Sequence, residues 1–418
     1  MSRSFTRMTI SAAVVSILAA CGAPVGSVST GSSVTPAPIP AASPASEAGL
    51  QAWVKSFRPR AIASGVRPEV YDNAMRFARY NPDVIRLDRK QAEFSRPVWE
   101  YLDSAASDSR TSKGRALAGN LSGTLGRIEA RYGVDRNIVM AVWGMESNFG
   151  ANRGKMQIIP SLATLAYDGR RGEMFAKQLV AALQIIQAGD TDPQHMLGSW
   201  AGAMGHTQFM PTSYLSYAVD FTGDGKRDIW SDDPTDSLAS TAAYLKRSGW
   251  VTGLPAVVEV RLPGGFNYGQ TGRGNVKSGA TWAAQGVRAV DGRSLPSGGI
   301  IAPAGAKGPA FLVTRNFMAI RAYNASDNYA LGVAMLANRI GGGPGIVGSF
   351  PREAGALTHN QKEEVQRRLN RLGYNVGEPD GAIGEKTMAA IKAFQQRIGV
   401  SPDGYANADL LKQLQARS

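Results

Sequence analysis

The sequence predicts a mainly α-helical protein, and three observations support this fold class. Apolar side chains recur at helical spacing in residues 178–187. Residues 237–247 show a helical pattern and end at a Ser-Gly pair, which is typical of a helix stop. Residues 360–414 contain three further apolar stripes separated by turn residues. A chain of 418 residues is long enough for two or three domains.

The N-terminus predicts export and a lipid anchor. Arg3 and Arg7 precede the uncharged apolar residues 10–18, a stretch shorter than a membrane-spanning helix and typical of a secretory signal. It ends in Leu-Ala-Ala-Cys, which resembles the lipobox of bacterial lipoproteins. We therefore expect residues 1–20 to be a signal peptide and Cys21 to be lipidated. The alternative is an ordinary signal peptide that leaves Cys21, the only cysteine, as a free thiol.

The next segment is read as a flexible tether, residues 21–47. Residues 22–46 carry no charge and consist mainly of Pro, Ala, Ser, Gly, Val and Thr, a composition that cannot bury enough apolar surface to fold. The formal net charge is +13, and loss of Arg3 and Arg7 with the signal leaves +11. Because export argues against nucleic acid, this basic charge favours an envelope polymer as partner, although solubility alone also explains it.

Residues 48–341 are predicted to form one mostly helical domain. Ser326 is a candidate N-cap for a helix that runs towards the glycine cluster at 341–343. Residues 257–310 are rich in glycine and predict short strands and loops, so we expect a small inserted β lobe. Residues 342–356, rich in glycine and proline, are predicted to be a linker.

Residues 357–418 are predicted to form a three-helix domain. The segment resembles the peptidoglycan-binding module of bacterial cell-wall enzymes. The residues that carry this resemblance are Leu369, Leu372, Gly373, Tyr374, Gly377, Asp380, Gly381, Gly384, Thr387, Ala390, Phe394, Gln395, Gly399, Asp403 and Gly404. The alternative is that these glycines and aspartates are only the turn residues of a small bundle.

Glu146 is an isolated carboxylate that interrupts the apolar run of residues 138–145 and is followed by Ser147, Asn148, Phe149 and Gly150. A helix of this composition is expected to be buried on most faces, where an ionised carboxylate is costly unless it is paired or protonated. Glu146 is therefore a candidate catalytic acid. The structural alternatives are that it caps an exposed helix end or pairs with a buried arginine.

Residues 198–214 combine small residues, aromatic residues and uncharged hydrogen-bonding groups. A saccharide site uses this mixture, because aromatic faces cover sugar faces and amides or hydroxyls bind the sugar hydroxyls. Close helix packing uses it equally well. Composition alone leaves the two interpretations open.

Together with Glu146, this segment closely resembles the lytic murein transglycosylases of the membrane-bound type B family, which have a lysozyme-like helical fold. The other matching residues are Tyr132, Gly133, Val134, the run 161–165, Arg170, Arg171, Tyr217, Ala218, Val219, Asp220 and Phe221. The resemblance implies cleavage of the β-1,4 bond between N-acetylmuramic acid and N-acetylglucosamine with formation of a 1,6-anhydro ring. It assigns to Glu146 the role of general acid and then base, with no cofactor required for the chemistry.

The resemblance also implies substrate-binding residues. Ser199, Gln208 and Phe209 match residues that line the saccharide site of the family, and Tyr244 and Tyr323 match tyrosines presented to the substrate. For both tyrosines the alternative is core packing. Two further candidates are Arg171, for the muramyl peptide or for stabilising the site, and Tyr101, where the surrounding motif departs from the family pattern.

Residues 220–236 predict a calcium site. Asp220, Thr222 and Asp224 place oxygen donors at positions 1, 3 and 5 of an EF-hand-like loop, and Lys226 stands at position 7. Position 12 is not glutamate, so the strict motif fails, and Asp236 is a candidate to complete the ligand set. Asp236 is equally a candidate N-cap for the next helix. We expect calcium, if bound, to be structural.

Four other function classes compete with this interpretation. A zinc hydrolase needs clustered ligands, and the three histidines form no His-Glu-x-x-His motif. No lysine follows a serine at the spacing of a penicillin-binding enzyme. A non-catalytic wall-tethering lipoprotein and a water-using muramidase remain as alternatives. The expected location is the periplasm, anchored in the inner leaflet of the outer membrane, with peptidoglycan strands as the partner and other cell-wall enzymes as further candidates.

Overall fold

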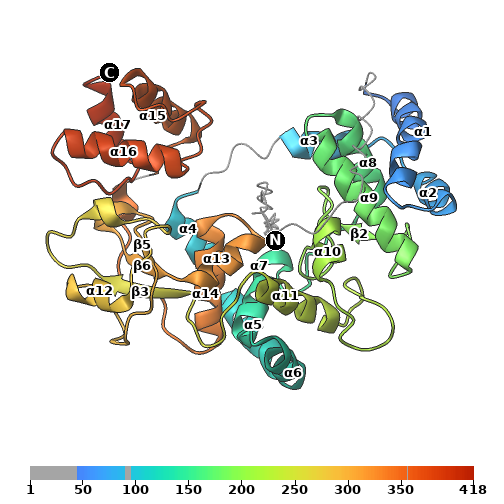
Figure 1. Cartoon of the computed structure of the whole chain (residues 1–418), viewed down its shortest axis with the longest axis horizontal. Coiled ribbons are helices and arrows are strands. Elements are labelled where there is room, and N and C mark those ends of the chain that lie inside the picture. Colours follow the sequence, from blue (N-terminus) through green and yellow to red (C-terminus); the bar gives the residue numbers. More distant parts are fainter. Residues whose placement is uncertain (1–44, 90–95, 355) are drawn as a thin grey trace, which may run out of the picture.

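The computed structural model describes residues 45–89, 96–354 and 356–418. The predicted signal peptide, the lipidation site Cys21 and the tether up to residue 44 lie outside the described residues. The described part is mainly helical, with one small sheet lobe and a separate C-terminal helical domain (Figure 1). The predicted fold class, including the inserted lobe and the three C-terminal helices, is confirmed.

The helical body consists of two groups of helices that pack around separate cores. One core is formed by α1 (Glu47–Ala63), α2 (Pro68–Met75), α3 (Pro82–Arg89), α8 (Ile158–Asp168), α9 (Gly172–Ala188) and α10 (Pro211–Tyr217). The other is formed by α4 (Val98–Ala105), α5 (Asp108–Asn120), α6 (Ser122–Tyr132), α7 (Arg136–Ser147), α11 (Thr235–Arg247), α13 (Arg315–Tyr323) and α14 (Asp327–Ile340). Tyr323 packs against both cores, so it marks their junction.

Helix α7 is the central helix of the second core. The Asp135 side chain caps its N-terminus by accepting a hydrogen bond from the Asn137 backbone N–H at 2.7 Å. Residues 138–144 are all buried, as the apolar pattern predicts. The helix ends at Asn148, which adopts a left-handed conformation with φ 51°.

The inserted lobe lies between α11 and α13 in the sequence. Its antiparallel sheet has the order β4-β3-β6-β5, and the fully buried Trp282 lies in its core. Its elements are β3 (Val257–Arg261), α12 (Gly279–Ala284), β4 (Arg288–Ala289), β5 (Gly299–Ile301), β6 (Ala310–Val313) and the 3-10 helices η2 (Tyr268–Gln270) and η3 (Gly305–Lys307). Thr314 ends the lobe, and its side chain caps α13.

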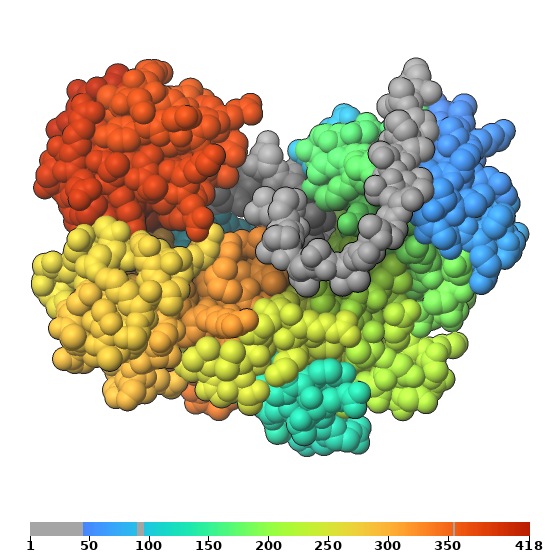
Figure 2. All heavy atoms as spheres, viewed as in Figure 1, coloured from blue at the N-terminus to red at the C-terminus, as the bar shows by residue number. Residues whose placement is uncertain are grey.

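The C-terminal domain contains α15 (His359–Arg371), α16 (Glu385–Arg397) and α17 (Ala408–Gln415) around its own apolar core. Figure 2 shows this domain, in red, against the inserted lobe, in yellow. The Lys392 ammonium donates hydrogen bonds to the Thr271 carbonyl at 2.5 Å and to its hydroxyl at 2.8 Å. Asp403 accepts a hydrogen bond from the Ala306 backbone N–H at 3.0 Å. The domain therefore contacts the lobe through specific polar groups.

The segment between α14 and α15 lies along the helical body rather than away from it. Ile346 and Phe350 pack against the second core. The Glu259 carboxylate accepts hydrogen bonds from the backbone N–H groups of Val347 at 2.9 Å and Gly348 at 2.7 Å. The segment ends in η4 (Arg352–Ala354). Within the described ranges, no helix has the length and apolar character needed to cross a membrane.

Candidate active site

Glu146 lies in the last turn of α7, where this helix packs against α14. Its side chain is neither fully buried nor freely exposed. The Tyr329 hydroxyl of α14 donates a hydrogen bond to Glu146 Oε1 at 2.6 Å. In the described part of the chain Glu146 forms no ion pair, so of the two structural alternatives the buried arginine partner is wrong: the carboxylate meets a neutral hydroxyl.

Burial raises the pKa of Glu146 to about 7, and the hydrogen bond from Tyr329 lowers it by less. Removal from water disfavours the charged form of a carboxylate, which explains the direction of the shift. Glu146 is therefore partly protonated near neutral pH. A carboxyl group in this state can donate a proton and later accept one.

The charge of Glu146 acts on three tyrosines. Burial, followed by the charge of Glu146, raises the pKa of Tyr101, Tyr323 and Tyr329. These hydroxyl groups therefore stay neutral and act as hydrogen-bonding groups. Tyr329 is the one that contacts Glu146 directly, and the sequence analysis did not select it.

The sequence offered only a weak signal for Tyr329. It follows the predicted N-cap Ser326 by three residues, and the Ser326 side chain accepts a hydrogen bond from its backbone N–H. Its contact with Glu146 spans 183 residues of sequence. A hydroxyl-bearing residue on the buried face of a helix is the feature to search for, because such hydroxyl groups need a polar partner.

Ser199 and Gln208 belong to a tight loop between β2 (Leu197–Gly198) and α10. A Cβ atom on Gly198 would lie 2.2 Å from the Ala203 carbonyl oxygen, so this loop requires glycine there. The Ser199 hydroxyl accepts a hydrogen bond from the Ala203 backbone N–H at 3.0 Å. The loop is thus closed on itself at the position of Ser199.

Gln208 has a left-handed backbone with φ 53°. Its side-chain amide donates hydrogen bonds to the carbonyl oxygens of Arg153 at 3.0 Å and Gly205 at 2.9 Å. Both N–H groups therefore have partners inside the protein. Among the described residues nothing donates to Gln208 Oε1, which leaves this oxygen as an acceptor for a ligand.

Phe209, Tyr244 and Tyr323 form an aromatic cluster at the junction of the two cores. Phe209 is buried, with its ring centroid 6.0 Å from that of Tyr244 and 5.8 Å from that of Tyr323. The Tyr244 and Tyr323 hydroxyls donate to the Ala322 and Thr207 carbonyls, both at 2.5 Å. Both tyrosines are half-buried, and their hydroxyl donors are satisfied. Their environment is therefore compatible both with substrate contact and with core packing.

Arg171 is held in an ion pair with the buried carboxylate of Asp88, which also binds Arg170. The Arg171 guanidinium lies 5.0 Å from the centre of the Phe175 ring. These contacts fix the arginine at the start of α9, in the first core. No contact recorded among the described residues joins it to Glu146, so its role towards a substrate stays a prediction.

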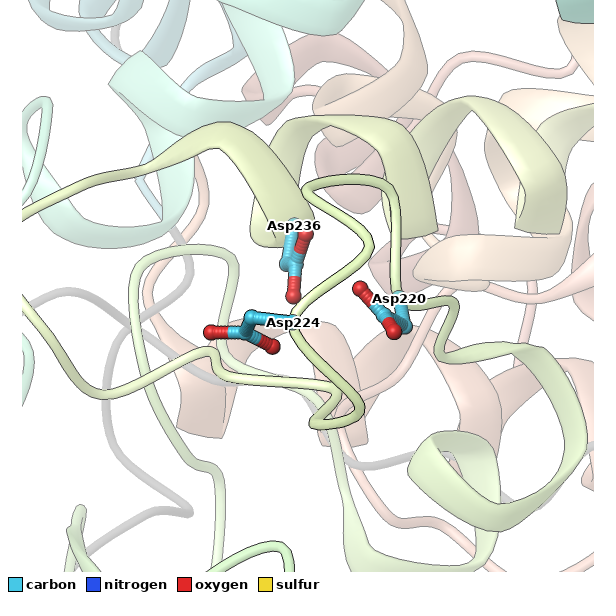
Figure 3. Close-up of side chains that lie close together, drawn as sticks. All are labelled: Asp220, Asp224 and Asp236. Carbon is cyan, nitrogen blue, oxygen red and sulfur yellow. The ribbon is translucent and has the colours of Figure 1, made fainter.

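The predicted calcium loop places three carboxylates together (Figure 3). Ligand atoms of Asp220, Asp224 and Asp236 all lie within 4.8 Å of one another. Asp236 is buried, and burial raises its pKa, to which the nearby charge of Asp220 contributes. Its oxygens accept backbone hydrogen bonds from Phe221 and Thr222 at 2.9 and 3.0 Å, which joins the start of α11 to the loop.

This cluster fits a hard divalent cation. The donors are all oxygen atoms, and Ca²⁺ takes such ligands in loops of this kind. In the described chain none of the three carboxylates forms an ion pair with a basic side chain. The Thr222 hydroxyl bonds to Asp220 at 3.3 Å, so it belongs to the same group, and Lys226 joins it through its backbone N–H, which donates to Asp224 at 2.9 Å.

Two protein-family models match this chain. The transglycosylase SLT domain model matches residues 49–338, which include Glu146 and the acidic loop at residues 220–236. This chain belongs to the transglycosylase SLT family. A peptidoglycan binding domain model matches residues 358–414.

Relatives of the SLT family include a curated protein and solved structures. Membrane-bound lytic murein transglycosylase B of Escherichia coli K12 is 43% identical over 141 residues, 32% of this chain and 38% of that protein. The matched part thus spans less than half the length of this curated relative. Pseudomonas aeruginosa SltB3, solved in complex with NAG-anhNAM-pentapeptide, is 47% identical with a TM-score of 0.84, covering 88% of this chain and 99% of that one.

A second solved relative is a structure with calcium. The Escherichia coli lytic transglycosylase Slt35, solved in complex with calcium, is 29% identical with a TM-score of 0.58. The match covers 70% of this chain and 92% of that one. The helical fold of the SLT family is therefore present here over most of the chain.

Proposed function

We propose that this protein is a lytic murein transglycosylase that cleaves the β-1,4 bond between N-acetylmuramic acid and N-acetylglucosamine and leaves a 1,6-anhydro ring. The observation that carries this proposal is Glu146, a single carboxyl group with a pKa of about 7 that is bound by a neutral tyrosine. The structure of SltB3 with NAG-anhNAM-pentapeptide supports the same product chemistry for this chain.

The reaction needs one group that donates and then accepts a proton. Protonated Glu146 gives its proton to the glycosidic oxygen as the bond from this oxygen to C1 of the muramic acid breaks. The resulting carboxylate then takes the proton of the C6 hydroxyl as its oxygen bonds to C1. Glu146 returns to its protonated form, so proton transfer balances without water.

The single carboxylate favours this reaction over hydrolysis. Glycosidases that use water normally carry two carboxyl groups at the bond they cleave. Among the described residues the Tyr329 hydroxyl is the side-chain hydrogen-bond partner of Glu146, and no second carboxylate bonds to it. A water-using muramidase is therefore the weaker alternative.

We assign substrate binding to the loop and aromatic cluster beside Glu146. Gln208 Oε1 is the acceptor for an N–H or O–H group of the sugar. Ser199, Phe209, Tyr244 and Tyr323 complete the proposed saccharide contacts. Tyr101 lies within the electrostatic influence of Glu146, which supports its place in the site, and Arg171 is proposed to bind the peptide stem.

We propose that calcium binds at Asp220, Thr222, Asp224, Lys226 and Asp236, with lysine contributing its backbone oxygen. The close carboxylates and the calcium complex of Slt35 support this assignment. The ion holds the 220–228 loop to the start of α11. Its role is structural, because the acid–base chemistry belongs to Glu146.

We further propose that Cys21 is lipidated after removal of residues 1–20. The lipobox-like sequence supports a lipid anchor, and one relative is named as membrane-bound. Residues 21–47 then tether the enzyme in the periplasm to the inner leaflet of the outer membrane. In this arrangement the catalytic domain, residues 48–341, cleaves the glycan strand. The linker, residues 342–356, joins it to residues 357–418, which bind the cell wall.

The test is the variant Glu146→Gln, which keeps the size of the side chain and removes its acid–base function. We expect turnover of purified cell wall to be abolished while thermal stability and wall binding in a pull-down assay are retained. A non-catalytic tethering lipoprotein instead predicts that wild-type protein releases no soluble product. Turnover by the variant would remove Glu146 from the mechanism.

A further inference from the structure

The chain turns sharply immediately after Glu146. Asn148, Phe149 and Gly150 have positive φ angles of 51°, 57° and 79° in succession. Asparagine and glycine tolerate this conformation, but a phenylalanine rarely adopts it. A conformation of this kind persists only when surrounding contacts hold it. The contacts that hold this turn therefore also position Glu146.

The turn is held from outside α7 by the backbone of His206. The Ser147 hydroxyl, next to Glu146, donates a hydrogen bond to the His206 carbonyl at 2.5 Å. The same hydroxyl accepts a hydrogen bond from the Gly150 backbone N–H at 2.8 Å. Ser147 is buried, so both bonds form away from bulk water.

The His206 side chain forms a second link to α7. His206 is 4% exposed, and the Trp143 indole N–H donates to its Nδ1 at 3.1 Å. An indole nitrogen can only donate, so Nδ1 carries no proton. The neutral ring therefore has its proton on Nε2, which donates to the Ser231 carbonyl at 2.8 Å. Burial is the main cause that lowers the pKa of His206, in agreement with the neutral form.

Charged groups lie on the outer side of the ring. Arg153 Nη1 is 3.3 Å from His206 Nε2 and donates to the Ser231 carbonyl at 2.6 Å. Arg153 also pairs with Asp232 at 2.7 Å. The arginine thus fixes the carbonyl that orients the histidine ring. His206 is held in one orientation by α7 on one side and by the 230–232 segment on the other.

The two links from His206 to α7 enclose Glu146. Trp143 stands three residues before Glu146 and Ser147 one residue after it. The residues after His206 lead into the proposed saccharide loop, where the Thr207 carbonyl accepts the Tyr323 hydroxyl and Gln208 follows. His206 therefore links α7, which carries Glu146, to the start of the proposed saccharide loop.

We propose that His206 is a positioning residue for Glu146, acting through the Trp143 indole and the Ser147 hydroxyl. This inference rests on the proposed function of Glu146. A displacement of a catalytic group by about 1 Å can lower a rate by about 100-fold, so the loss of one such link is expected to lower kcat. KM is expected to change little, because the buried His206 side chain offers almost no surface to a sugar.

The test separates the two bonds of the ring in the full-length protein. In His206→Asn the side-chain oxygen takes the place of Nδ1 and can accept from Trp143. In His206→Gln the side-chain nitrogen takes the place of Nε2 and can donate to Ser231, but the indole loses its acceptor. His206→Leu removes both bonds. Turnover is measured on a soluble peptidoglycan fragment together with the indole N–H NMR signal of Trp143.

We expect His206→Gln and His206→Leu to lower kcat by about 10- to 100-fold, with KM within about 3-fold of wild type. His206→Asn is expected to recover most of the loss and to retain the position of the Trp143 signal. The control is His195→Asn, which changes an exposed histidine that bonds to Asp192 at 2.6 Å. This control is expected to behave as wild type.

Wild-type kcat in His206→Gln, or an equal loss in the Asn, Gln and Leu variants, would overturn the proposal. If His206→Leu does not fold, the comparison of the Asn and Gln variants decides. Glu146→Gln is measured in the same assay. An inactive Glu146→Gln beside a fully active His206→Gln rejects the positioning role alone, whereas an active Glu146→Gln rejects the proposed function of Glu146.

Discussion

At the scale of single residues, the charge state of Glu146 depends on two opposed influences. Burial raises its pKa to about 7, and the hydrogen bond from Tyr329 opposes this shift. A donor to a carboxylate stabilises the charged form. Tyr329 therefore helps to set the pH range in which Glu146 is protonated. This role requires only its hydrogen bond to Glu146 and no contact between Tyr329 and the substrate.

Tyr329→Phe removes this hydrogen bond while keeping the ring. The pKa of Glu146 is then expected to rise above its wild-type value. Because the general acid must be protonated, activity falls as pH rises through this pKa, so the alkaline limb of the kcat/KM profile is expected to move to higher pH. The measurement is a pH–rate profile of both proteins. An alkaline limb that stays in place or moves to lower pH would contradict this role of Tyr329.

Much of the site can be predicted from sequence at this scale, but the partners of its residues cannot. An acid in an apolar helix is visible locally, because burial follows from the neighbours of Glu146 in the helix. The Tyr329 hydroxyl reaches it only when α14 packs on α7, across 183 residues. The ion pair of Arg171 with Asp88 is likewise a tertiary contact and has no local signature.

At the scale of elements, the acidic loop and α11 depend on each other. Asp236 in the first turn of α11 accepts backbone hydrogen bonds from the loop, and its carboxylate lies close to those of Asp220 and Asp224. The sequence left open whether Asp236 is a ligand or an N-cap. Its side chain bonds to the preceding loop rather than capping α11, where no side-chain cap is present, so the N-cap interpretation is wrong.

Calcium is expected to stabilise the wild-type protein against unfolding. A ligand that binds only the folded state at about 100 times its Kd adds about 2.7 kcal/mol. Thermal melting with calcium and with a chelator measures this effect. Asp224→Asn is expected to abolish most of the calcium-dependent shift, and Asp291→Asn, on the inserted lobe, serves as the control. If the wild type melts at the same temperature with calcium and with the chelator, the proposed calcium site is wrong.

At the scale of the whole molecule, the wall-binding domain and the helical body meet on the inserted lobe. Arg273 of the lobe pairs with Glu385 of α16 at 2.7 Å and with Asp327 of α14 at 3.2 Å. Lys392 adds the bonds to Thr271. The composition of residues 342–356 predicts a connection between domains. It does not predict the contacts of Arg273 and Lys392, because these depend on side chains from three separate segments.

Removing the Lys392 and Glu385 side chains together is expected to release the C-terminal domain from the lobe. These polar contacts are only partly buried, and contacts of this kind each contribute about 1 kcal/mol, so the domain is expected to detach without unfolding. Limited proteolysis in residues 342–356 should become faster, and turnover of a soluble fragment should be unchanged. Lys386→Ala, on the same helix, is the control. An unchanged proteolysis rate would show that these contacts do not hold the domain.

The central claim is that the C6 hydroxyl of the muramic acid, rather than water, attacks C1 after Glu146 has protonated the oxygen that leaves this carbon. The direct measurement is digestion of purified cell wall in ¹⁸O-labelled water, followed by mass analysis of the muropeptides. We predict products that end in 1,6-anhydro-N-acetylmuramic acid, each one water lighter than a reducing end and without label. Reducing ends that carry ¹⁸O as the primary product would contradict the account.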